Sequence, residues 1–514
     1  MKAAAAAPIS ERGQPGKEAD VCLVLEGTYP YVRGGVSSWV HQIIQGLPEV
    51  SFNLVFIGSA PERHPRRVYQ LPANVVHLEE IFLALTPPPE PVAYVPGDPA
   101  FFAASHGLHQ GFRDGSPGDD ELLARVVQHL VEAPERCQRD FLHSERAWAE
   151  IVRRYESSAP TRSFLEYFWT IRSMHAPLFR LAAAAARLPS AAVYHVVSTG
   201  FAGFLAMLLR RRRRRPLLLT EHGIYTKERR IEVLQADWIF DDERLGPDAD
   251  EVSVGVFRQL WIRFFEQLGK MTYEAAEVIV ALYEGNRARQ IADGAPPDRT
   301  LVLANGIAVE RFAGLRAARP AGPPMVFALI GRVVPIKDIK TFVRAARLVC
   351  DAAPEAEAWI VGPEDEDPIY AEECRALALS LGLERQLRFL GFKRMEEVLP
   401  AIGLNVLTSI SEAQPLVVLE GFAAGVPAVA TDVGCCRELI EGRTPADRAL
   451  GPAGAVVGIA DPDATARAIL GLLRDPAGWA AARGAAIARV EQSYAEPLML
   501  DRYRALYRGL REEH

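Results

Sequence analysis

The chain of 514 residues is too long for one hydrophobic core, so we expect two domains. Hydrophobic residues make up 49% and charged residues 24%, as in globular proteins, and the net charge of −7 argues against nucleic-acid binding, which needs a basic surface. Six cysteines without regular spacing predict neither a disulfide framework nor a zinc site, and they favour a reducing compartment.

The first 18 residues, MKAAAAAPISERGQPGKE, resemble a signal peptide only superficially, because their apolar run is short and mostly alanine. We predict a disordered tail there. No later run is long enough to predict a membrane-spanning helix, and the nearest, at 200–209, stops at six arginines, 210–215. We interpret this arginine run as a solvated helix end; the alternative is a contact with an anionic membrane or an acidic partner.

Residues 19–315 are expected to form the first domain. Its apolar strand candidates lie at 20–26, 52–58, 74–79, 192–197, 216–220, 277–280 and 300–304. The interval of about 84–190 breaks their spacing with a proline-rich loop and with helical stretches at 121–132 and 163–188. We interpret that interval as an insertion.

Two turns of this half carry candidate site residues. Gly34 and Gly35, in EGTYPYVRGGVSSWV, precede a predicted helix, although two adjacent glycines more often mark a plain turn. His222, in EHGIYTKERR, follows a strand and is expected either at a ligand site or as a structural histidine.

Residues 325–490 are expected to form the second domain. Strand candidates at 325–330, 356–361, 386–390, 404–408, 427–431 and 454–458 alternate with helices. Such alternation predicts a parallel, doubly wound sheet whose ligand sites lie in the turns that follow strands. The segment 316–324 (RAARPAGPP) is a candidate linker, and a helix is expected at 491–514, with a return to the first domain left open.

The turn GRVVPIKDIK places Arg332 and Lys337 after the first strand of this domain. Two cations at the mouth of a parallel sheet suit a diphosphate, because arginine binds its oxygens bidentately and lysine adds a point charge. The alternative is two solvated surface bases.

The stretch SEAQPLVVLEGFAAGVPAVATD holds two acidic residues in an apolar setting. Glu412 precedes a short predicted helix and Glu420 lies inside it, where a carboxylate needs partners. Gln414 is a poor cap and Pro415 suits the first helical position, so the helix N–H groups are expected to be free for an oxygen-rich ligand. Each glutamate could instead form a structural ion pair.

Two further turns are less informative. TDVGCCREL contains Gly434 and the pair Cys435 and Cys436, which we interpret as packing residues, with a redox switch as the alternative. EDEDP at 364–368 has acidic residues at an expected helix start. Acidic side chains interact favourably with the helix dipole at that end, so we predict no metal site there.

The order of these motifs resembles the family 4 retaining glycosyltransferases of GT-B fold. The resemblance rests on RGGVSSWV, NGI at 305–307, GRVVPIK, the Glu412 stretch and TDVGCCRELI. The family usually has a second glycine where this chain has Cys435. The N-terminal pieces EGTYPYVRGGVSSWVHQII, STGFAG and TEHGIYTKER more narrowly resemble the cytosolic synthases of Pel-type exopolysaccharide systems.

The resemblance implies two Rossmann-like domains that face each other across a cleft, with the insertion forming part of an acceptor-side wall. It assigns catalytic roles to four residues: His222, Arg332, Lys337 and Glu412. Within this set, Arg332 and Lys337 match a diphosphate clamp, Glu412 the contact with the transferred sugar and His222 a histidine near it. It implies donor binding by Gly34, Gly35, Phe392, Lys393, Gln414, Pro415, Leu416, Val417 and Glu420, with Glu420 on the ribose and Gly35 under the phosphates.

By the same resemblance, the expected function is retaining transfer of a sugar from a UDP-sugar to a growing exopolysaccharide, without metal or cofactor. Expected partners are the UDP-sugar, a carbohydrate acceptor and an inner-membrane export complex, and no nucleic acid. The expected location is cytoplasmic, with a peripheral position at the inner membrane as an alternative. A GT-B sugar-nucleotide epimerase and a non-catalytic nucleotide-sugar-binding scaffold remain alternatives.

Overall fold

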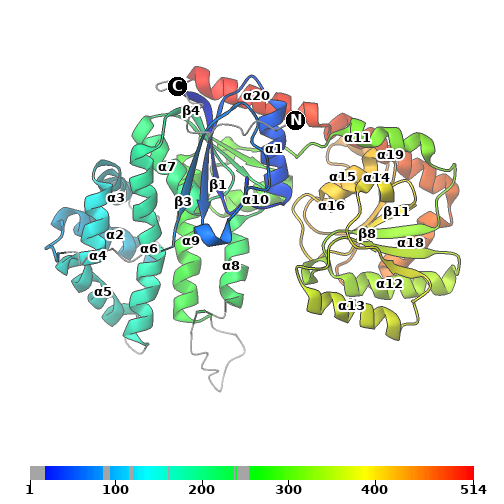
Figure 1. Cartoon of the computed structure of the whole chain (residues 1–514), viewed down its shortest axis with the longest axis horizontal. Coiled ribbons are helices and arrows are strands. Elements are labelled where there is room, and N and C mark those ends of the chain that lie inside the picture. The colour runs from blue at the N-terminus through cyan, green and yellow to red at the C-terminus, as the bar shows by residue number, and fades with distance from the viewer. Residues whose placement is uncertain are drawn as a thin grey trace, which may run out of the picture. The chain divides into compact units, whose positions relative to one another are not determined.

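The structure is a computed structural model that describes residues 18–84, 93–114, 120–159, 162–236, 238–239 and 254–513. The chain divides into two compact units (Figure 1). The first unit comprises Met1–Ala281, Ala288–Leu301 and Arg504–His514, and the second comprises Leu282–Arg287 and Val302–Tyr503. The predicted tail, up to residue 17, and residues 85–92 of the proline-rich loop lie outside the described residues.

The first unit is built on a seven-stranded sheet among its described residues, in the order β3-β2-β1-β4-β5-β6-β7. All seven predicted strands are confirmed, with small shifts at their ends. They are β1 (Ala19–Glu26), β2 (Phe52–Gly58), β3 (Val75–Phe82), β4 (Ala191–Val196), β5 (Leu217–Glu221), β6 (Val278–Ala281) and β7 (Thr300–Val302). Every residue of β2 is buried, as expected for a parallel strand covered on both faces.

Helices cover this sheet (Figure 1). They are α1 (Gly35–Gly46), α7 (Phe201–Arg213), α8 (Tyr225–Gln235), α9 (Val256–Ala275) and α10 (Glu284–Ala292), the last of which begins in the second unit. Between β3 and β4 the chain forms five helices in its described part: α2 (Pro99–Asp114), α3 (Asp120–Glu132), α4 (Pro134–His143), α5 (Glu145–Ser158) and α6 (Phe164–Arg187). The helical stretches predicted at 121–132 and 163–188 correspond to α3 and α6.

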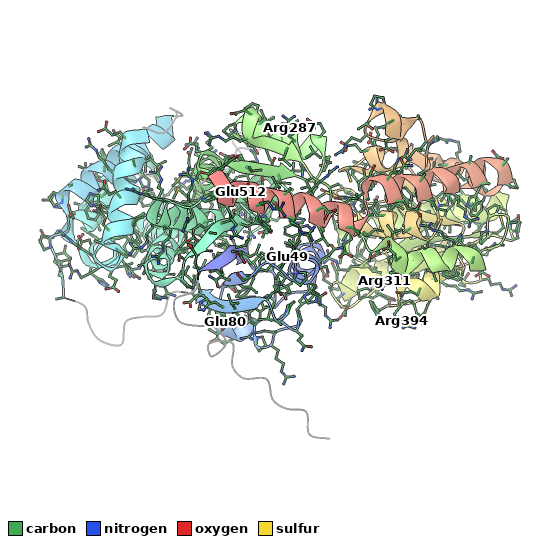
Figure 2. All side chains as sticks on the ribbon, turned by 90° about the horizontal axis from the view of Figure 1, so that it is seen from above. Glu49, Glu80, Arg287, Arg311, Arg394 and Glu512 are labelled. Carbon is green, nitrogen blue, oxygen red and sulfur yellow. The ribbon has the colours of Figure 1, made fainter. Side chains whose placement is uncertain are left out.

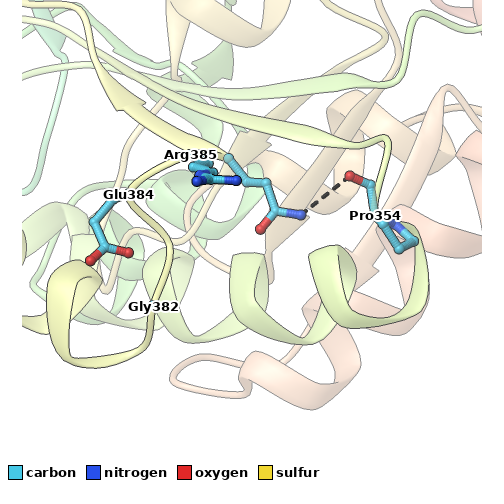
Figure 3. A pocket seen from close by; sticks show the side chains of 5 residues that line it. Pro354, Gly382, Glu384 and Arg385 are labelled. Atoms are coloured by element: carbon cyan, nitrogen blue, oxygen red, sulfur yellow. Dashed lines mark hydrogen bonds between the residues drawn. The ribbon is translucent and has the colours of Figure 1, made fainter.

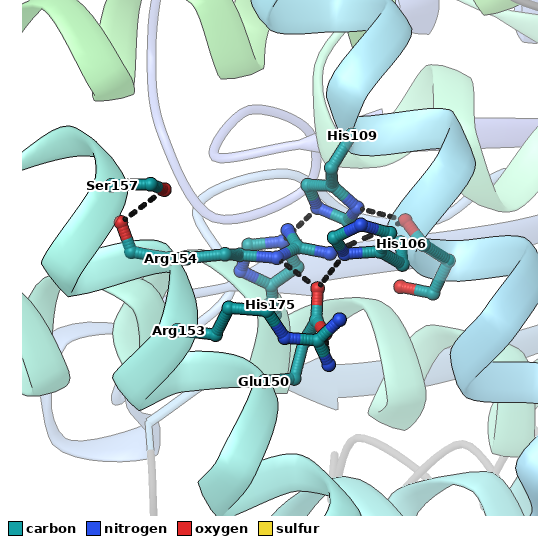
Figure 4. A network of polar contacts seen from close by, with 8 residues as sticks. His106, His109, Glu150, Arg153, Arg154, Ser157 and His175 are labelled. Carbon is teal, nitrogen blue, oxygen red and sulfur yellow. Dashed lines mark hydrogen bonds and ion pairs between the residues drawn. The ribbon is translucent and has the colours of Figure 1, made fainter.

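A polar network holds the helices of the insertion together (Figure 4). Glu150 of α5 binds His106 of α2 at 2.7 Å and also accepts a hydrogen bond from Arg154 at 2.5 Å. His109 and His175, from α2 and α6, meet at 3.0 Å. Because Glu150 is buried and the other groups are half-buried between helices, such partners offset the loss of contact with water.

The second unit is built on a six-stranded sheet among its described residues, in the order β10-β9-β8-β11-β12-β13. Its strands are β8 (Val326–Ile330), β9 (Glu357–Val361), β10 (Leu387–Phe389), β11 (Leu404–Leu407), β12 (Ala428–Thr431) and β13 (Gly454–Val457), as predicted. Its longer helices are α12 (Ile339–Ala352), α13 (Pro368–Ser380), α15 (Leu416–Ala423), α18 (Pro462–Leu473) and α19 (Pro476–Ser493). The strand pairs in both sheets for which a register is defined are parallel, which confirms the predicted fold class.

The candidate linker 316–324 lies inside the second unit, which already resumes at Val302. The reason is that α11 (Val309–Ala313) inserts Phe312, only 1% exposed, into the core of that unit. The last helix, α20 (Glu496–Glu513), starts in the second unit and ends in the first. There Arg504 donates to Glu49, labelled in Figure 2, at 2.7 Å.

The arginine run forms the end of α7, where positively charged side chains interact favourably with the helix dipole. Several of its side chains have protein partners: Arg210 pairs with Glu277, Arg213 donates to the carbonyl of Leu188 and Arg215 donates to Glu18. Among the described residues, no helix is both long and apolar enough to cross a bilayer.

Candidate functional site

The order of the second sheet defines one switch point. From β8 the chain adds β9 and β10 on one side and then continues with β11 on the other side of β8. In doubly wound sheets, ligands bind at the carboxyl ends of strands at such a point. The two loops that leave β8 and β11 there contain Arg332, Lys337 and Glu412.

Lys337 and Glu412 are in direct contact at this switch point. Their side chains form a short, half-buried ion pair, and Ser409 donates a second hydrogen bond to the same carboxylate oxygen at 2.7 Å. Thr408, at the end of β11, donates to the backbone carbonyls of Lys337 and Asp338 and so joins the two loops. This contact is the structural ion pair that the sequence left open as an alternative for Glu412, with Lys337 as the partner.

Arg332 points to a different partner. Its guanidinium contacts both carboxylate oxygens of Glu366 at 2.5 and 2.6 Å, and both side chains are about half exposed. Glu366 lies in EDEDP and was overlooked, because only its acidic neighbours were considered. Asp367 caps α13 by accepting from the N–H of Tyr370 at 3.0 Å, which confirms the helix-start interpretation.

Glu420 of α15 carries a half-buried carboxylate. The structure gives its side chain no hydrogen bond or ion pair to any described residue. Burial raises its pKa to about 7, an effect that Arg311 opposes and Glu396 reinforces. Arg311, labelled in Figure 2, is itself bound to Glu396 at 2.6 Å. The partner that sequence analysis required for Glu420 is therefore not supplied by these residues.

The start of α15 has no side-chain cap, as expected. Pro415 is the capping residue rather than the first helical residue, because its ψ of 103° is extended. The Gln414 amide donates to the Asn305 carbonyl and accepts from the Asn305 N–H, so it ties NGI to this turn. Leu416 and Val417 are half-buried.

Phe392 and Lys393 follow β10 at the same edge of the sheet and are exposed. The Phe392 ring is 76% exposed, which is unusual for a phenylalanine. Gly391 precedes it with φ of +61°, a conformation that glycine adopts without strain. The turn thus presents an aromatic surface to solvent.

The loop that follows β12 packs on the Glu412 loop. Gly434 has φ of +56°, and a Cβ there would lie 2.4 Å from the carbonyl oxygens of Glu412 and Ala413. Cys435 donates its N–H to the Ala413 carbonyl at 2.9 Å. Burial raises the pKa of the Cys435 thiol and that of Cys436, the latter to about 12, which disfavours the thiolate that redox chemistry needs and supports the packing interpretation.

In the first unit, Gly34 and Gly35 lie exposed at the start of α1. No side chain caps that helix, and a Cβ at either glycine would meet no atom within 4 Å. The uncapped N–H groups and the open space beside them are compatible with an anion at this terminus.

His222 follows β5 and is buried, with 8% of its surface exposed. Its ring packs edge-on with the Trp39 ring, and the two ring centroids lie 4.6 Å apart. Its Nε2 has no hydrogen-bond partner among the described residues. Burial lowers its pKa to about 3, so the imidazole is neutral at physiological pH. A buried ring nitrogen without a partner suits a ligand that supplies one.

Glu221, which precedes His222, was missed by sequence analysis. Its buried carboxylate accepts from the Tyr273 hydroxyl at 2.7 Å, the Gln290 amide at 3.1 Å and the Tyr225 N–H at 3.1 Å. Burial raises the pKa of Glu221 to about 7, although these hydrogen bonds lower it. Glu221 therefore fixes the turn that carries His222. Its position directly before that histidine, in EHG, is the sequence feature that could have identified it.

A hollow of about 620 Å³ lies on the other side of the second unit, where β10 begins (Figure 3). Gln386 lines this hollow, and its side-chain amide donates to the Pro354 carbonyl at 3.2 Å. None of the predicted site residues lines this hollow.

The fold and these switch-point residues define a two-domain protein of the GT-B class. Residues 19–298 match the family described as a domain of unknown function (DUF3492), and the chain belongs to that family. Residues 324–475 match the family described as glycosyl transferases group 1.

Similar curated proteins include several D-inositol 3-phosphate glycosyltransferases. That of Streptomyces scabiei is 30% identical over 249 residues, which are 45% of this chain and 51% of the relative. That of Geodermatophilus obscurus is 33% identical over 189 residues, 32% of this chain and 42% of the relative. The chain thus spans about half the length of these relatives.

Two solved structures share the fold over nearly the whole chain. Anabaena HepE in complex with UDP and glucose is 16% identical with a TM-score of 0.54, covering 95% of this chain and 99% of that one. The sucrose-phosphate synthase of Thermosynechococcus elongatus is 17% identical with a TM-score of 0.56, covering 96% and 100%.

Proposed function

We propose that the protein is a retaining glycosyltransferase that transfers a sugar from a UDP-sugar to a growing exopolysaccharide of Pel type. The observation that carries this proposal is Glu420, a half-buried carboxylate that no described residue satisfies. It lies at the switch point of a domain that matches glycosyl transferases group 1. HepE, which shares the fold, was solved with UDP and glucose.

In this proposal Glu420 accepts hydrogen bonds from the ribose hydroxyls and Glu412 holds the transferred sugar. Phe392 and Lys393 border the base, where the exposed ring offers a stacking surface. The residues at the start of α15, from Gln414 to Val417, form the floor of the donor site through backbone groups, since the Gln414 amide is engaged by Asn305.

Arg332 and Lys337 would bind the diphosphate. Arg332 exchanges Glu366 for phosphate oxygens, and an exposed ion pair of this kind contributes only about 0–1 kcal/mol. Lys337 already lies beside Glu412, so the sugar contact and the phosphate contact are adjacent. With these two cations on the leaving group, the proposal needs no metal and no cofactor.

The resemblance to family 4 enzymes implies that residues of the first unit also contact the donor. Gly34 and Gly35 would offer N–H groups to the phosphates, and the open space around them supports this role. His222 would present its neutral, unpartnered Nε2 to the donor sugar.

Retention follows from the roles of the acidic residues. Glu412 and Glu420 are assigned to hydroxyl groups, and a double displacement would need a further carboxylate as nucleophile. The acceptor hydroxyl would therefore attack the anomeric carbon from the face that UDP leaves. The bond to the phosphate oxygen breaks as the new glycosidic bond forms, and the departing phosphate takes the acceptor proton.

The further partners are a carbohydrate acceptor and an export complex at the inner membrane, with the protein on the cytoplasmic side. The narrower resemblance of the N-terminal motifs to Pel-type synthases supports this assignment. The surface of the arginine run offers such a complex a docking place at Arg211 and Arg214, which have no hydrogen-bond or ion-pair partner among the described residues.

The proposal is tested by calorimetry with UDP. Glu420→Ala should weaken UDP binding by roughly 1.5–3 kcal/mol, about 10- to 150-fold, the range for hydrogen bonds to a charged group. Glu397→Ala, at an exposed glutamate paired with Arg394, is the matched control and should bind as the unsubstituted chain does. Equal affinity in the folded Glu420 variant would contradict the assignment.

Turnover assays separate the classes of enzyme. UDP release only in the presence of acceptor, unaffected by EDTA, is expected of this transferase. A sugar-nucleotide epimerase would turn over without acceptor, and a scaffold would bind UDP without turnover. NMR of the new linkage should show the α anomer from an α-linked donor, and a β signal would rule out retention.

A further inference from the structure

The helical insertion of the first unit contains a second pocket, of about 310 Å³. It lies between α4, α5 and α6, which form one side of the unit in Figure 1. Its lining includes the aromatic residues Tyr94, Phe141, Trp148 and Phe168 and two nitrogen bases, His143 and Arg172. The remaining lining residues are Leu142, Ser144, Ala147 and Ile151. None of the described residues that line it is acidic.

Two of the aromatic side chains at this pocket are largely exposed, while Phe141 and Phe168 are half-buried. Tyr94 is 63% and Trp148 51% exposed. The Trp148 ring packs edge-on against Phe164 at 5.6 Å and lies 6.1 Å from Phe168, so packing orients the indole. Large exposed aromatic rings at one pocket mark a binding surface rather than a core.

Arg172 is the second distinctive feature. Its guanidinium lies 5.9 Å from the Phe168 ring and 6.0 Å from the Trp169 ring. The structure gives it no ion pair or hydrogen bond to a described residue, and burial lowers its pKa. Beside it, burial and the Arg172 charge lower the pKa of His143. A partly desolvated cation without an acceptor is costly, and a ligand with oxygen acceptors would offset that cost.

We propose that this pocket binds a pyranose unit of a saccharide chain. A pyranose has an apolar C–H face, which stacks on an aromatic ring, and a rim of hydroxyl groups, which accept from a guanidinium and an imidazole. A wholly apolar ligand would leave Arg172 unsatisfied. The volume is at the lower limit of ordinary ligand pockets, roughly 300 Å³, and suits one sugar ring rather than a folded partner.

This inference rests on the proposed function in one respect, namely that the acceptor of a polymerising glycosyltransferase is a saccharide chain. The pocket is made by the insertion of the first unit, and its lining shares no residue with the switch-point site of the second unit. Its role would be to bind a sugar unit of the growing chain other than the reacting one, so that longer acceptors bind more tightly than short ones.

The test is saturation-transfer NMR on the full chain with three probes: cellotetraose, N-acetylchitotetraose and tetragalacturonate. We expect transfer to at least one tetrasaccharide. Trp148→Ala should weaken its binding at least tenfold, and Arg172→Met should do so as well. Trp238→Ala is the matched control, since Trp238 is 62% exposed in the same unit but does not line the pocket.

Each outcome decides the matter. No transfer to any of the three at millimolar concentration, or transfer that survives both pocket substitutions, would overturn the proposal. So would a dimer in the ultracentrifuge that Trp148→Ala abolishes while no saccharide binds, since a second copy would then fill the pocket. Calorimetry with UDP on the same samples separates the two proposals: normal UDP binding without saccharide binding rejects only the pocket, and the reverse rejects the proposed function.

Discussion

Glu420, which is half-buried, and Glu221, which is buried, show how partners distinguish two carboxylates at the residue scale. Burial raises the pKa of each to about 7. Glu221 accepts several protein hydrogen bonds and holds a turn, whereas Glu420 has none to a described residue. The same electrostatic shift therefore marks a structural group in one case and a candidate ligand contact in the other, and only the partners separate them.

The Glu420 shift predicts a stability change with pH. Because its pKa in the folded chain is raised from 4.5 to about 7, its contribution to stability is fully present below pH 4.5 and is lost as pH rises through 7. Glu420→Gln should remove that loss and stabilise the second unit at pH 8 by roughly 3 kcal/mol, but by only about 1 kcal/mol at pH 5.

Denaturant unfolding at the two pH values measures this difference. Glu397→Gln, at an exposed glutamate of the same unit, is the control and should change stability little at either pH. A Glu420→Gln effect that is the same at pH 5 and pH 8 would contradict the raised pKa.

At the scale of elements, the candidate donor site depends on two interlocked loops. The loop after β12 approaches the Glu412 loop so closely that Gly434 has no room for a side chain. This explains the glycine in TDVGCC without invoking a ligand. It also implies that a residue outside the site controls the position of Glu412.

Gly434→Ala should therefore displace Glu412 and weaken UDP binding at least tenfold while the secondary structure is retained. The control is Gly451→Ala, because Gly451 also has a positive φ, +85°, but a Cβ there would meet no atom within 4 Å. Both variants carry backbone strain of order 1 kcal/mol, and only the first has the clash. Equal UDP affinities in calorimetry would show that the loop position does not matter.

The segment after α16 (Cys436–Glu441) is held by one buried cation. Arg489 of α19 is fully buried, pairs with Asp447 at 2.5 Å and donates to the carbonyls of Ile440 and Gly451 at 2.7 and 2.8 Å. Removing one member of a buried pair leaves the other charge without compensation.

Arg489→Met should cost about 3–5 kcal/mol in the unfolding of the second unit. Arg437→Met is the matched control, since Arg437 pairs with Asp432 and Glu441 at an exposed position, where such pairs contribute about 0–1 kcal/mol. Thermal or denaturant unfolding compares the two. Similar losses in both variants would mean that Arg489 acts only as a surface pair does.

The distribution of histidine distinguishes the units at the scale of the whole molecule. The second unit, which the structure describes throughout, contains no histidine. The first contains buried ones: burial lowers the pKa of His195 and His222 to about 3 and that of His175 to about 4. The two units should therefore respond differently to acid.

A histidine whose pKa is lowered by folding stabilises the folded chain above pH 6.5, the pKa of an ordinary histidine. That contribution is lost as the pH falls toward the pKa of the folded state, because the unfolded chain then binds more protons. Each of the three groups should cost the first unit about 2 kcal/mol at pH 5. We expect hydrogen exchange to show the first unit opening before the second as pH falls from 7 to 5. His195→Gln should reduce the difference, and simultaneous opening of both units would contradict this prediction.

The sequence by itself determined the two sheets. Their strands are continuous apolar runs bounded by turn residues, and in parallel sheets such runs are buried on both faces, so the local pattern identifies them. The turns that follow strands are equally local, which is why Arg332, Lys337 and Glu412 could be placed at the mouth of one sheet.

The tertiary structure decided what those side chains contact. The pairing of Lys337 with Glu412, the contact of Arg332 with Glu366 and the engagement of Gln414 by Asn305 join residues from separate turns. The described residues give Glu420 no such partner. Pairing depends on distances between segments 30 to more than 100 residues apart, which spacing along the chain does not encode. The aromatic pocket arose in the same way, from three helices whose individual patterns predicted only an insertion.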